Sequence, residues 1–345
     1  MPNIAPVSLC LILALGLSAC EEKADSRPSK NIAWYGVMVH PYINAVEEGV
    51  AGFTQDTGIP VKKQIGQTWT QDNENANVEA LAAKGYNGFA ICPADASAAN
   101  GLYEELSANG AFVVSYAAPT LLPTTASFCV ATDVEEAARL ATEALIGYMG
   151  SEGRILNVLE LIEDPNTILR KRGIEETVAR YPEVRIVREI AGMSSIEEST
   201  AKIQDALATQ VDAIDGIICT GYTPTVAAAA ILAEWHQNPA NKRIRFVGID
   251  TDALVLNAIA AGHIDATVSQ NPYGQGYIAC GLLSYLLDGW TANPDHYFVD
   301  SGTVLVTRDN LQSYEGEIKT ITANLMSQLE TRYLSAPARY LSAPE

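Results

Sequence analysis

The sequence predicts an α/β protein made of two similar lobes, each built around a parallel β-sheet, with a ligand cleft between them. Three observations support this prediction. The chain has 345 residues, which is about the length of two ordinary domains. Short and almost continuously apolar runs alternate with helical patterns, as in sheets that helices cover on both faces. The alternation pauses near residue 132 and begins again near residue 154, so we expect the same unit twice.

The first lobe begins with N-I-A-W-Y-G-V, a strand pattern that the helical stretch Y-I-N-A-V-E-E-G-V-A-G-F follows. Strand and helix patterns then alternate in the same way. The strands expected in this set span residues 31–37, 61–66, 88–93, 111–116 and 127–132. Their apolar character predicts a parallel sheet buried on both faces.

The second lobe repeats this pattern, with helices such as P-T-V-A-A-A-A-I-L-A-E-W between its strands. Its expected strands span residues 154–160, 184–190, 216–220, 245–250 and 266–270. Ligands of open α/β sheets bind outside the carboxyl ends of the strands. Two such sheets that face each other therefore predict a central cleft that a hinge can close.

The order of these patterns also predicts how the chain divides. We assign residues 31–132 plus about 271–300 to the first lobe, and residues 133–270 plus about 301–312 to the second. Residues 313–345 then form a C-terminal helix and tail, with the helix at roughly 316–334.

The N-terminus carries a targeting signal. Residues 1–19 contain an uncharged apolar run that is too short to span a membrane, which predicts a signal peptide. The run ends in L-S-A-C, which resembles a bacterial lipobox and implies cleavage before Cys20 and acylation of Cys20. Residues 20–30 would then be a lipid-anchored linker. An ordinary signal peptide cut at the same place remains the alternative.

Charge and cysteine content exclude several classes of function. The net charge of −19 opposes binding to nucleic acid, which needs a basic patch. Neither a Cys-x-x-Cys motif nor a Cys/His spacing typical of a metal site occurs, and the sequence contains no G-x-S-x-G, H-E-x-x-H or P-loop motif. We therefore expect no metal, no cofactor and no enzymatic activity. Cys92, Cys129, Cys219 and Cys280 lie in apolar runs and are either bridged or free.

Polar and aromatic residues gather where the predicted strands end. Examples are V-M-V-H-P-Y after the first strand, T-G-Y-T-P, G-I-D-T-D and V-S-Q-N-P-Y. The stretch Q-N-P-Y-G-Q-G-Y, residues 270–277, contains more amide and aromatic groups than a plain loop needs. We interpret it as one wall of the cleft and as a crossing point between the lobes.

Several of these motifs, in this order, resemble the ribose-type (type I) periplasmic sugar-binding proteins of ABC transporters. They are H-P-Y-I-N-A-V-E-E-G-V-A, N-G-F-A-I-C-P-A-D, N-T-I-L-R-K-R-G-I-E-E-T, F-V-G-I-D-T-D and A-T-V-S-Q-N-P-Y-G-Q-G-Y. The resemblance covers about residues 31–312. It implies two Rossmann-like lobes hinged around a central site, and a bacterial lipoprotein form of the family.

The resemblance also implies roles for individual residues. Arg172, Asp250 and Gln270 would hydrogen-bond the hydroxyls of a sugar, because charged and amide groups make strong directional bonds to hydroxyls. Tyr42 would stack on the apolar face of the sugar ring, with His40 at the polar position before it.

The chain departs from the ribose-binding pattern at three places. Tyr116-Ala117 stands where ribose binders carry an Asp-Arg pair, Gly221-Tyr222 replaces an Asn-Asp, and Met193 occupies the second stacking position. Fewer charges and more tyrosines favour another sugar, a polyol or a sugar-like signal molecule. The candidate site residues are Gln270, Asp250, Arg172, Tyr42, His40, Tyr116, Tyr222, Trp34, Asn166 and Met193, with Trp69 as a further aromatic that could line the cleft.

These observations lead to one functional expectation. The protein would bind a monosaccharide or sugar-like polyol and deliver it, as a monomer, to the membrane permease of an ABC import system. It would work in the periplasm or at the cell surface, held to a membrane by the lipid on Cys20. The alternative is a sensory binding protein that presents a sugar or an autoinducer-type signal to a chemoreceptor or histidine kinase.

Overall fold

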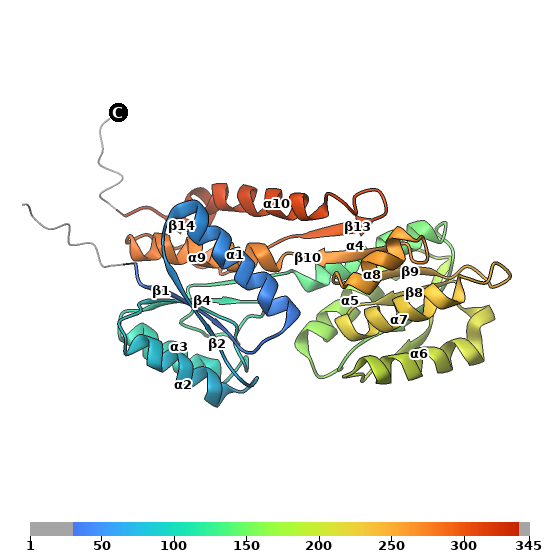
Figure 1. Ribbon diagram of the computed structural model, residues 1–345, viewed down its shortest axis with the longest axis horizontal. Coiled ribbons are helices and arrows are strands. Elements are labelled where there is room, and N and C mark those ends of the chain that lie inside the picture. The colour runs from blue at the N-terminus through green and yellow to red at the C-terminus, as the bar shows by residue number, and fades with distance from the viewer. Residues whose placement is uncertain (1–29, 338–345) are drawn as a thin grey trace, which may run out of the picture.

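The computed structural model describes residues 30–337, which fold into two α/β lobes that lie side by side (Figure 1). The signal peptide and Cys20 lie outside the described residues. Within the described part, no helix is both long enough and apolar enough to cross a membrane.

The first lobe contains a six-stranded sheet in the order β12-β5-β4-β3-β1-β2. All neighbouring strands in it are parallel. The strands are β1 (Ile32–Gly36), β2 (Val61–Ile65), β3 (Gly88–Ile91), β4 (Phe112–Tyr116), β5 (Phe128–Ala131) and β12 (Phe298–Asp300). Its helices are α1 (Pro41–Thr57), α2 (Gln71–Ala82), α3 (Ala99–Ala108) and α9 (Pro272–Leu287).

The second lobe repeats this architecture with the sheet order β13-β10-β9-β8-β6-β7. Its strands are β6 (Gly153–Val158), β7 (Val184–Ile190), β8 (Gly216–Cys219), β9 (Arg245–Ile249), β10 (Ala266–Gln270) and β13 (Thr303–Thr307). Its helices are α4 (Val134–Tyr148), α5 (Pro165–Val178), α6 (Ile196–Gln210), α7 (Tyr222–Trp235) and α8 (Ala253–Ala260). Strands β12 and β13 are not among those expected from the sequence, and β13 pairs antiparallel to β10.

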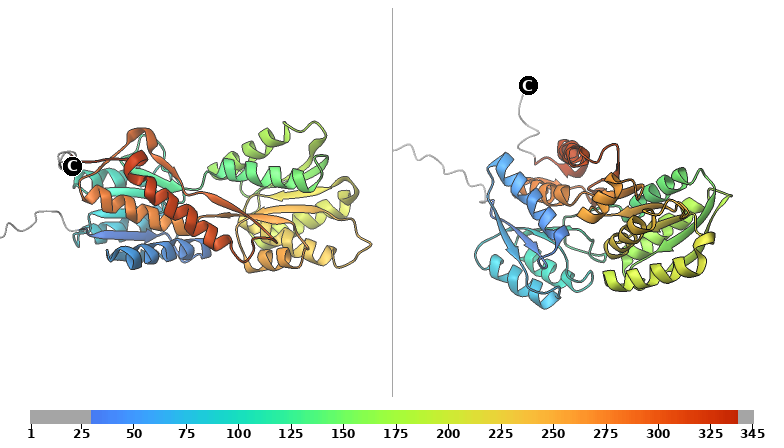
Figure 2. Two further views of the ribbon diagram at one scale, coloured as in Figure 1. Left: turned by 90° about the horizontal axis from the view of Figure 1, so that it is seen from above. Right: turned by 45° about the vertical axis from the view of Figure 1, so that its right-hand side comes forward.

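The chain passes between the two sheets at three places: between β5 and α4, between β10 and α9, and between β12 and β13. The C-terminal helix α10 (Tyr314–Gln328) packs on α9 and β13, which belong to different lobes. Seen from above, α10 lies across the region that joins the lobes (Figure 2). A small sheet of β11 (Thr291–Ala292) and β14 (Leu334–Ser335) ties the following segment to the first lobe.

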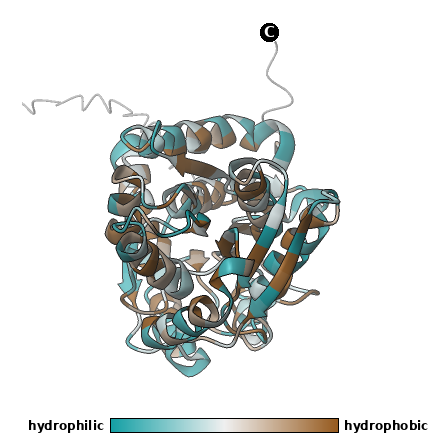
Figure 3. Ribbon diagram, turned by 90° about the vertical axis from the view of Figure 1, so that its right-hand side faces the viewer, coloured by the Kyte–Doolittle hydropathy of each residue, from teal (hydrophilic) through white to brown (hydrophobic). Residues whose placement is uncertain are grey.

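The central strands of both sheets are buried because helices cover the two faces of each sheet. Strands β1, β3, β5 and β8 consist entirely of buried residues. The covering helices carry polar and apolar residues on the same element, as expected of helices that pack on one side only (Figure 3). Cys92, Cys129, Cys219 and Cys280 are buried and free, which settles the alternative left open by the sequence.

Helix caps place several side chains at the cleft-facing edge of each sheet. The side chain of His40 caps α1 by accepting a hydrogen bond from the Tyr42 amide at 3.2 Å, and Pro41 occupies the first turn. Asp252 caps α8 and Asn271 caps α9 in the same way. Each cap begins a helix directly after a strand, so the first residues of these helices face the space between the lobes.

Candidate ligand-binding site

A cavity of about 460 Å³ lies between the lobes at the carboxyl ends of their strands. Its volume falls within the range of small-molecule sites, about 300–1,000 Å³. Residues of both lobes line it, and the two walls differ in their chemistry. Among the described residues, no group of His, Cys, Asp and Glu side chains is arranged to hold a metal ion.

The first lobe supplies a wall of aromatic and apolar side chains. His40 and Tyr42 come from the start of α1, and Trp69 from the loop between β2 and α2. The Trp69 indole Nε1 donates a hydrogen bond to the carbonyl oxygen of Ala94 at 3.1 Å, and half of its surface remains exposed. The rest of this wall is Pro41, Ile43, Ala45, Cys92, Pro93, Ala117, Ala118 and Pro272. None of these described residues is an Asp, Glu, Lys or Arg.

The second lobe supplies the charged and most of the hydrogen-bonding groups. This wall consists of Val134, Glu160, Asn166, Arg170, Tyr222, Thr223, Asp250, Thr251, Ser269 and Gln270. Glu160 is held in place because its Oε1 accepts hydrogen bonds from the backbone amide and the hydroxyl of Thr223, both at 3.1 Å. Arg170 is only 8% exposed, and its Nε has no hydrogen-bond partner among the described residues.

Asp250 is held in an uncommon backbone conformation at the end of β9. Its φ of 73° lies in the left-handed region, which a residue with a side chain enters at a cost of roughly 1–2 kcal/mol. Neighbouring strand β10 holds it there: the Asp250 amide donates to the Val268 carbonyl at 2.9 Å, and the Thr267 hydroxyl donates to the Asp250 carbonyl at 2.8 Å. Gln270 Nε2 also donates to the Asp250 carboxylate at 2.7 Å.

Burial raises the pKa of the Asp250 carboxyl, although the Gln270 hydrogen bond and the charge of Arg170 both favour the ionised form. Removing a carboxylate from water costs free energy that its partners return only in part. Donors that a bound molecule adds to this carboxylate would lower its pKa again.

Two tyrosines stand at the junction of the walls. Burial and the nearby charge of Asp250 raise the pKa of Tyr42, so its hydroxyl stays protonated. The Tyr222 hydroxyl donates to the Asp252 carboxylate at 2.9 Å, and burial raises its pKa as well. The rings of Tyr222 and His40 meet edge to face across the cleft, with centroids 6.4 Å apart.

Comparison with known proteins decides the class to which this cleft belongs. Residues 35–291 match the family model described as a periplasmic binding protein domain, which is well over half of the chain. The chain belongs to the periplasmic binding protein family. Family membership confirms the predicted class, places the folded part outside the cytoplasm, and makes this a binding protein and not an enzyme. The two mostly parallel sheets with their covering helices are the type I form of the fold.

Curated relatives of this periplasmic binding protein are distant in sequence. A xylitol-binding protein of Mycolicibacterium smegmatis is 21% identical over 314 residues, which cover 90% of this chain and 86% of that protein. A D-apiose import binding protein of Actinobacillus succinogenes is 26% identical over 167 residues, which cover 48% of this chain and 52% of that protein.

Solved structures share the fold. The periplasmic ribose ABC transporter structure from Conexibacter woesei gives a TM-score of 0.75 at 18% identity, covering 85% of this chain and 97% of the other. AraP, an arabinose-binding protein from Geobacillus stearothermophilus, gives a TM-score of 0.72 at 21% identity, covering 81% of this chain and 98% of the other.

The structure brings six of the ten sequence-predicted site residues together in the cleft of this periplasmic binding protein. They are His40, Tyr42, Asn166, Tyr222, Asp250 and Gln270, and Trp69 joins them. They lie at the end of a strand, in the loop that follows it or in the first turn of a helix, where ligand contacts of α/β sheets are expected.

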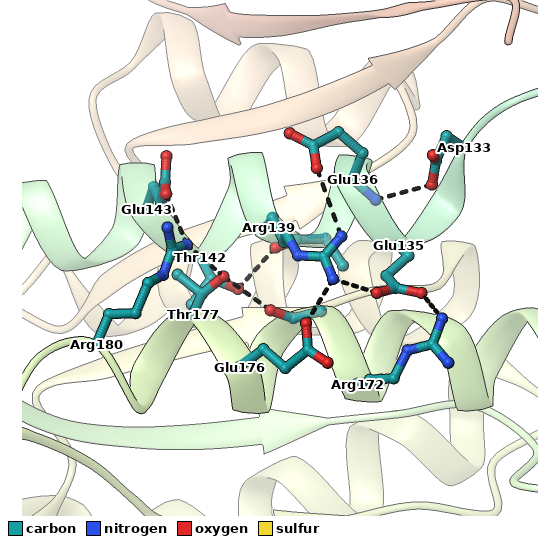
Figure 4. Close-up of polar contacts among 12 residues, drawn as sticks. Asp133, Glu135, Glu136, Arg139, Thr142, Glu143, Arg172, Glu176, Thr177 and Arg180 are labelled. Carbon is teal, nitrogen blue, oxygen red and sulfur yellow. Dashed lines mark hydrogen bonds and ion pairs between the residues drawn. The ribbon is translucent and has the colours of Figure 1, made fainter.

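Arg172 lies outside the cleft. Its side chain is 56% exposed and forms an ion pair with Glu135 of α4, within a network that also contains Arg139 and Glu176 (Figure 4). Residues two apart on a helix point in different directions, and the buried face of α5 contains Thr167, Arg170, Ile174 and Thr177. The guanidinium that reaches the cleft is therefore that of Arg170.

Three apolar candidates belong to the core and not to the site. Trp34 and Tyr116 are fully buried and stack against each other, with ring centroids 6.0 Å apart. The Tyr116 hydroxyl donates to the Tyr35 carbonyl at 2.9 Å, so its polar end is already satisfied within the protein. Met193 is 1% exposed and packs in the core of the second lobe.

Arg170 and Glu160 line the cleft but are not among the residues predicted from the sequence. The helical period would have found Arg170, because the apolar and small residues of α5 recur at intervals of three and four and Arg170 falls among them. Glu160 follows β6 directly, so the rule that ligand contacts follow strand ends applies to it as well.

Proposed function

We propose that this protein is the solute-binding component of an ABC import system and takes a monosaccharide or sugar-like polyol into the cleft. The two walls support this ligand class. The second lobe offers carboxylate, guanidinium, amide and hydroxyl groups that match a series of hydroxyls. The first lobe offers the faces of Trp69, Tyr42 and His40, which match the C–H face of a small ring or an extended polyol chain. Xylitol, ribose and arabinose appear in the names of its relatives.

The observation that carries the proposal is the state of Arg170. Arg170 is more than nine-tenths buried as a residue, and its Nε–H has no partner in the described part of the chain, which is costly unless a ligand oxygen completes its hydrogen bonds. Asp250 lies close enough for its pKa to respond to the charge of Arg170. A hydroxyl of a polyol can accept from the guanidinium and donate to the carboxylate at the same time, so one functional group serves both residues.

The proposal also covers closure of the lobes, delivery of the ligand, attachment to the membrane and the ligand contacts. The lobes close over the ligand by rotation about the three crossing segments, and the closed monomer delivers the ligand to a membrane permease. A lipid on Cys20 holds the folded part close to that permease. The side chains of Gln270, Asp250, Arg170, Tyr42, His40, Tyr222 and Asn166 form the ligand contacts.

A thermal-shift screen with a matched pair of variants tests the proposal. Xylitol, D-apiose, D-arabinose and D-ribose are added to the purified protein, and a ligand present at 100 times its Kd should stabilise it by about 2.7 kcal/mol. Arg170→Met should abolish the ligand-induced rise in Tm, because the substitution removes the buried donor and keeps the length of the side chain.

Arg172→Met is the control, because it changes the same residue type on the same helix but outside the cleft. It should keep the full ligand-induced rise in Tm. An equal loss of ligand response in both variants would contradict the proposed site. The absence of a response of the parent protein to any small polyol would contradict the proposed ligand class.

A further inference from the structure

A buried polar cluster occupies the region where the chain crosses between the lobes. Thr132 lies at the first crossing, Asn271 at the second and Ser301 at the third. All three are buried, with exposed fractions of 5%, 0% and 0%. Apolar side chains would fill such a region at lower cost, so the polar groups need an explanation.

Asn271 ties the second crossing to the third. Its Nδ2 donates to the Ser301 carbonyl at 2.7 Å and to the Thr322 hydroxyl of α10 at 3.1 Å. Its Oδ1 accepts from the Gly274 amide at 2.6 Å. Both ends of this amide are satisfied, which makes Asn271 a fixed connection between these segments.

Gln275 lies one helical turn further along α9 and is fully buried, but its amide is only half satisfied. Its Nε2 lies 2.7 Å from the Tyr42 hydroxyl, and 3.4 Å from the hydroxyls of both Thr132 and Ser301. Its Oε1 has no hydrogen-bond partner among the described residues. One side chain on the second crossing thus contacts the first crossing, the third crossing and Tyr42.

The contact with Tyr42 leads from the crossings into the cleft. Tyr42 lines the cavity, and its hydroxyl oxygen accepts a hydrogen bond from Gln275 Nε2. The hydroxyl therefore keeps its own proton to donate, either to Thr132 beside it or to a molecule in the cleft. Gln275 in this way fixes the orientation of the Tyr42 hydroxyl at the wall of the cleft.

We propose that Gln275 is a positioning residue that couples the Tyr42 wall of the cleft to the relative orientation of the two lobes. The contacts at 3.4 Å are long for hydrogen bonds, and both hydroxyls stand where crossing segments leave the first sheet, so a lobe rotation that moves these segments would alter both distances. A lobe orientation that brings the hydroxyl of Thr132 or Ser301 closer to the Gln275 amide gains a hydrogen bond. The Gln275 Oε1, which has no partner among the described residues, favours such an orientation. A ligand that accepts from Tyr42 fixes the other end of the same chain of contacts. Only this last step rests on the proposed function.

The distance between the lobes, measured by electron–electron double resonance, tests the coupling without any ligand. Spin labels are attached to Glu79→Cys on α2 and Gln204→Cys on α6, which are exposed positions in different lobes. The full chain carries Cys10→Ser and Cys20→Ser, and its four other thiols are buried, so labels attach only to the introduced cysteines. Gln275→Met should shift or broaden the distance distribution of the ligand-free protein.

Thr322→Val is the matched control, since it removes a buried hydroxyl from the same cluster that contacts Asn271 but not Gln275 or Tyr42. It should leave the distance distribution unchanged. Where Gln275→Met does not fold, Thr132→Val breaks the same contact from the first crossing and should shift the distribution. A distribution in the Gln275→Met or Thr132→Val protein that equals that of the parent overturns the proposal.

A second measurement uses xylitol and D-arabinose as probes. Gln275→Met should weaken binding about tenfold, the factor for one oriented hydrogen bond, and the effect should vanish in a Tyr42→Phe background. Additive effects of the two substitutions would overturn the part of the proposal that concerns Tyr42. If neither probe binds the parent protein, the proposed ligand class fails, while the ligand-free distances still decide the role of Gln275.

Discussion

Glu74 predicts an unusual dependence of stability on pH. It lies in α2 and is fully buried, and its Oε2 accepts from the Ala94 amide at 2.6 Å. Burial raises its pKa from the ordinary value of 4.5 to about 7. Within the described part of the chain, Oε1 of Glu74 and Oε1 of the neighbouring Gln71 have no hydrogen-bond partner, so two buried acceptors lack a donor. A proton on Glu74 supplies that donor.

The sign of the effect follows from the raised pKa. Below pH 4.5 the carboxyl is protonated in both the folded and the unfolded chain, and the folded state keeps its full stability. As the pH rises to about 7, the unfolded chain ionises first, and stability falls until the folded carboxyl ionises as well. The shift corresponds to a loss of about 3 kcal/mol between these limits.

Glu74→Gln should remove this loss, because the amide keeps the shape and supplies the missing donor at every pH. At pH 8 the variant should melt roughly 6 °C above the parent, at about 2 °C per kcal/mol for a chain of this size. At about pH 4, where the carboxyl is mostly protonated in both states, the two should melt together. Glu79→Gln, on the exposed side of the same helix, is the control. Parallel melting curves of the Glu74→Gln protein and the parent at both pH values would refute the reasoning.

Two further predictions concern Asp250 and the glycines of the helices. Asp250→Asn should keep the stability of the fold, because asparagine tolerates a positive φ, but should abolish the response to sugars or polyols in calorimetry. Asp250→Val should also lower the free energy of unfolding by roughly 1–3 kcal/mol, and equal chemical denaturation of the two variants would contradict the strain argument. Gly49→Ala should destabilise the protein by about 3 kcal/mol or more, because the new Cβ would meet the Tyr273 backbone carbonyl where α1 packs on α9. At Gly101 in α3, an added Cβ would have no atom of the described residues within 4 Å, so Gly101→Ala should stabilise the protein by about 0.5–1 kcal/mol. Similar urea midpoints for the two glycine variants would refute the packing argument.

Most of the fold follows from the sequence because the central strands are buried on both faces. Such strands need apolar side chains in succession, and runs such as G-I-I-C and F-V-G-I therefore mark them. The edge strands β12 and β13 escaped prediction for the opposite reason. Strand β12 has three residues with one of them buried, and β13 alternates buried and half-buried residues, which weakens the apolar signal.

The same physics separates the site residues that sequence reasoning found from those it did not. His40, Tyr222 and Asp250 lie beyond strand ends, where the direction of a side chain matters less than its place in the chain. Within a helix or strand, the direction of the side chain decides whether a residue reaches the cleft. Trp34 lies inside β1 and its ring turns into the core, while Arg172 points away from the cleft to Glu135. A sequence motif identifies the segment that lies near the cleft. The position of a residue within the helical or strand period then decides whether its side chain points into the cleft.

The two lobes present the same backbone to the cleft but different chemistry. Strands β4 and β9 hold the same place in the order of their sheets, and each is followed by a residue with positive φ that lines the cavity. These residues are Ala117 at 67° and Asp250 at 73°. Because the backbone paths match, the contrast between a methyl group and a carboxylate arises from the side chains alone. The charged residues that line the cleft therefore belong to the second lobe, while the first lobe contributes shape and aromatic surface, which suits the proposed ligand with a hydroxyl-rich side and a less polar side.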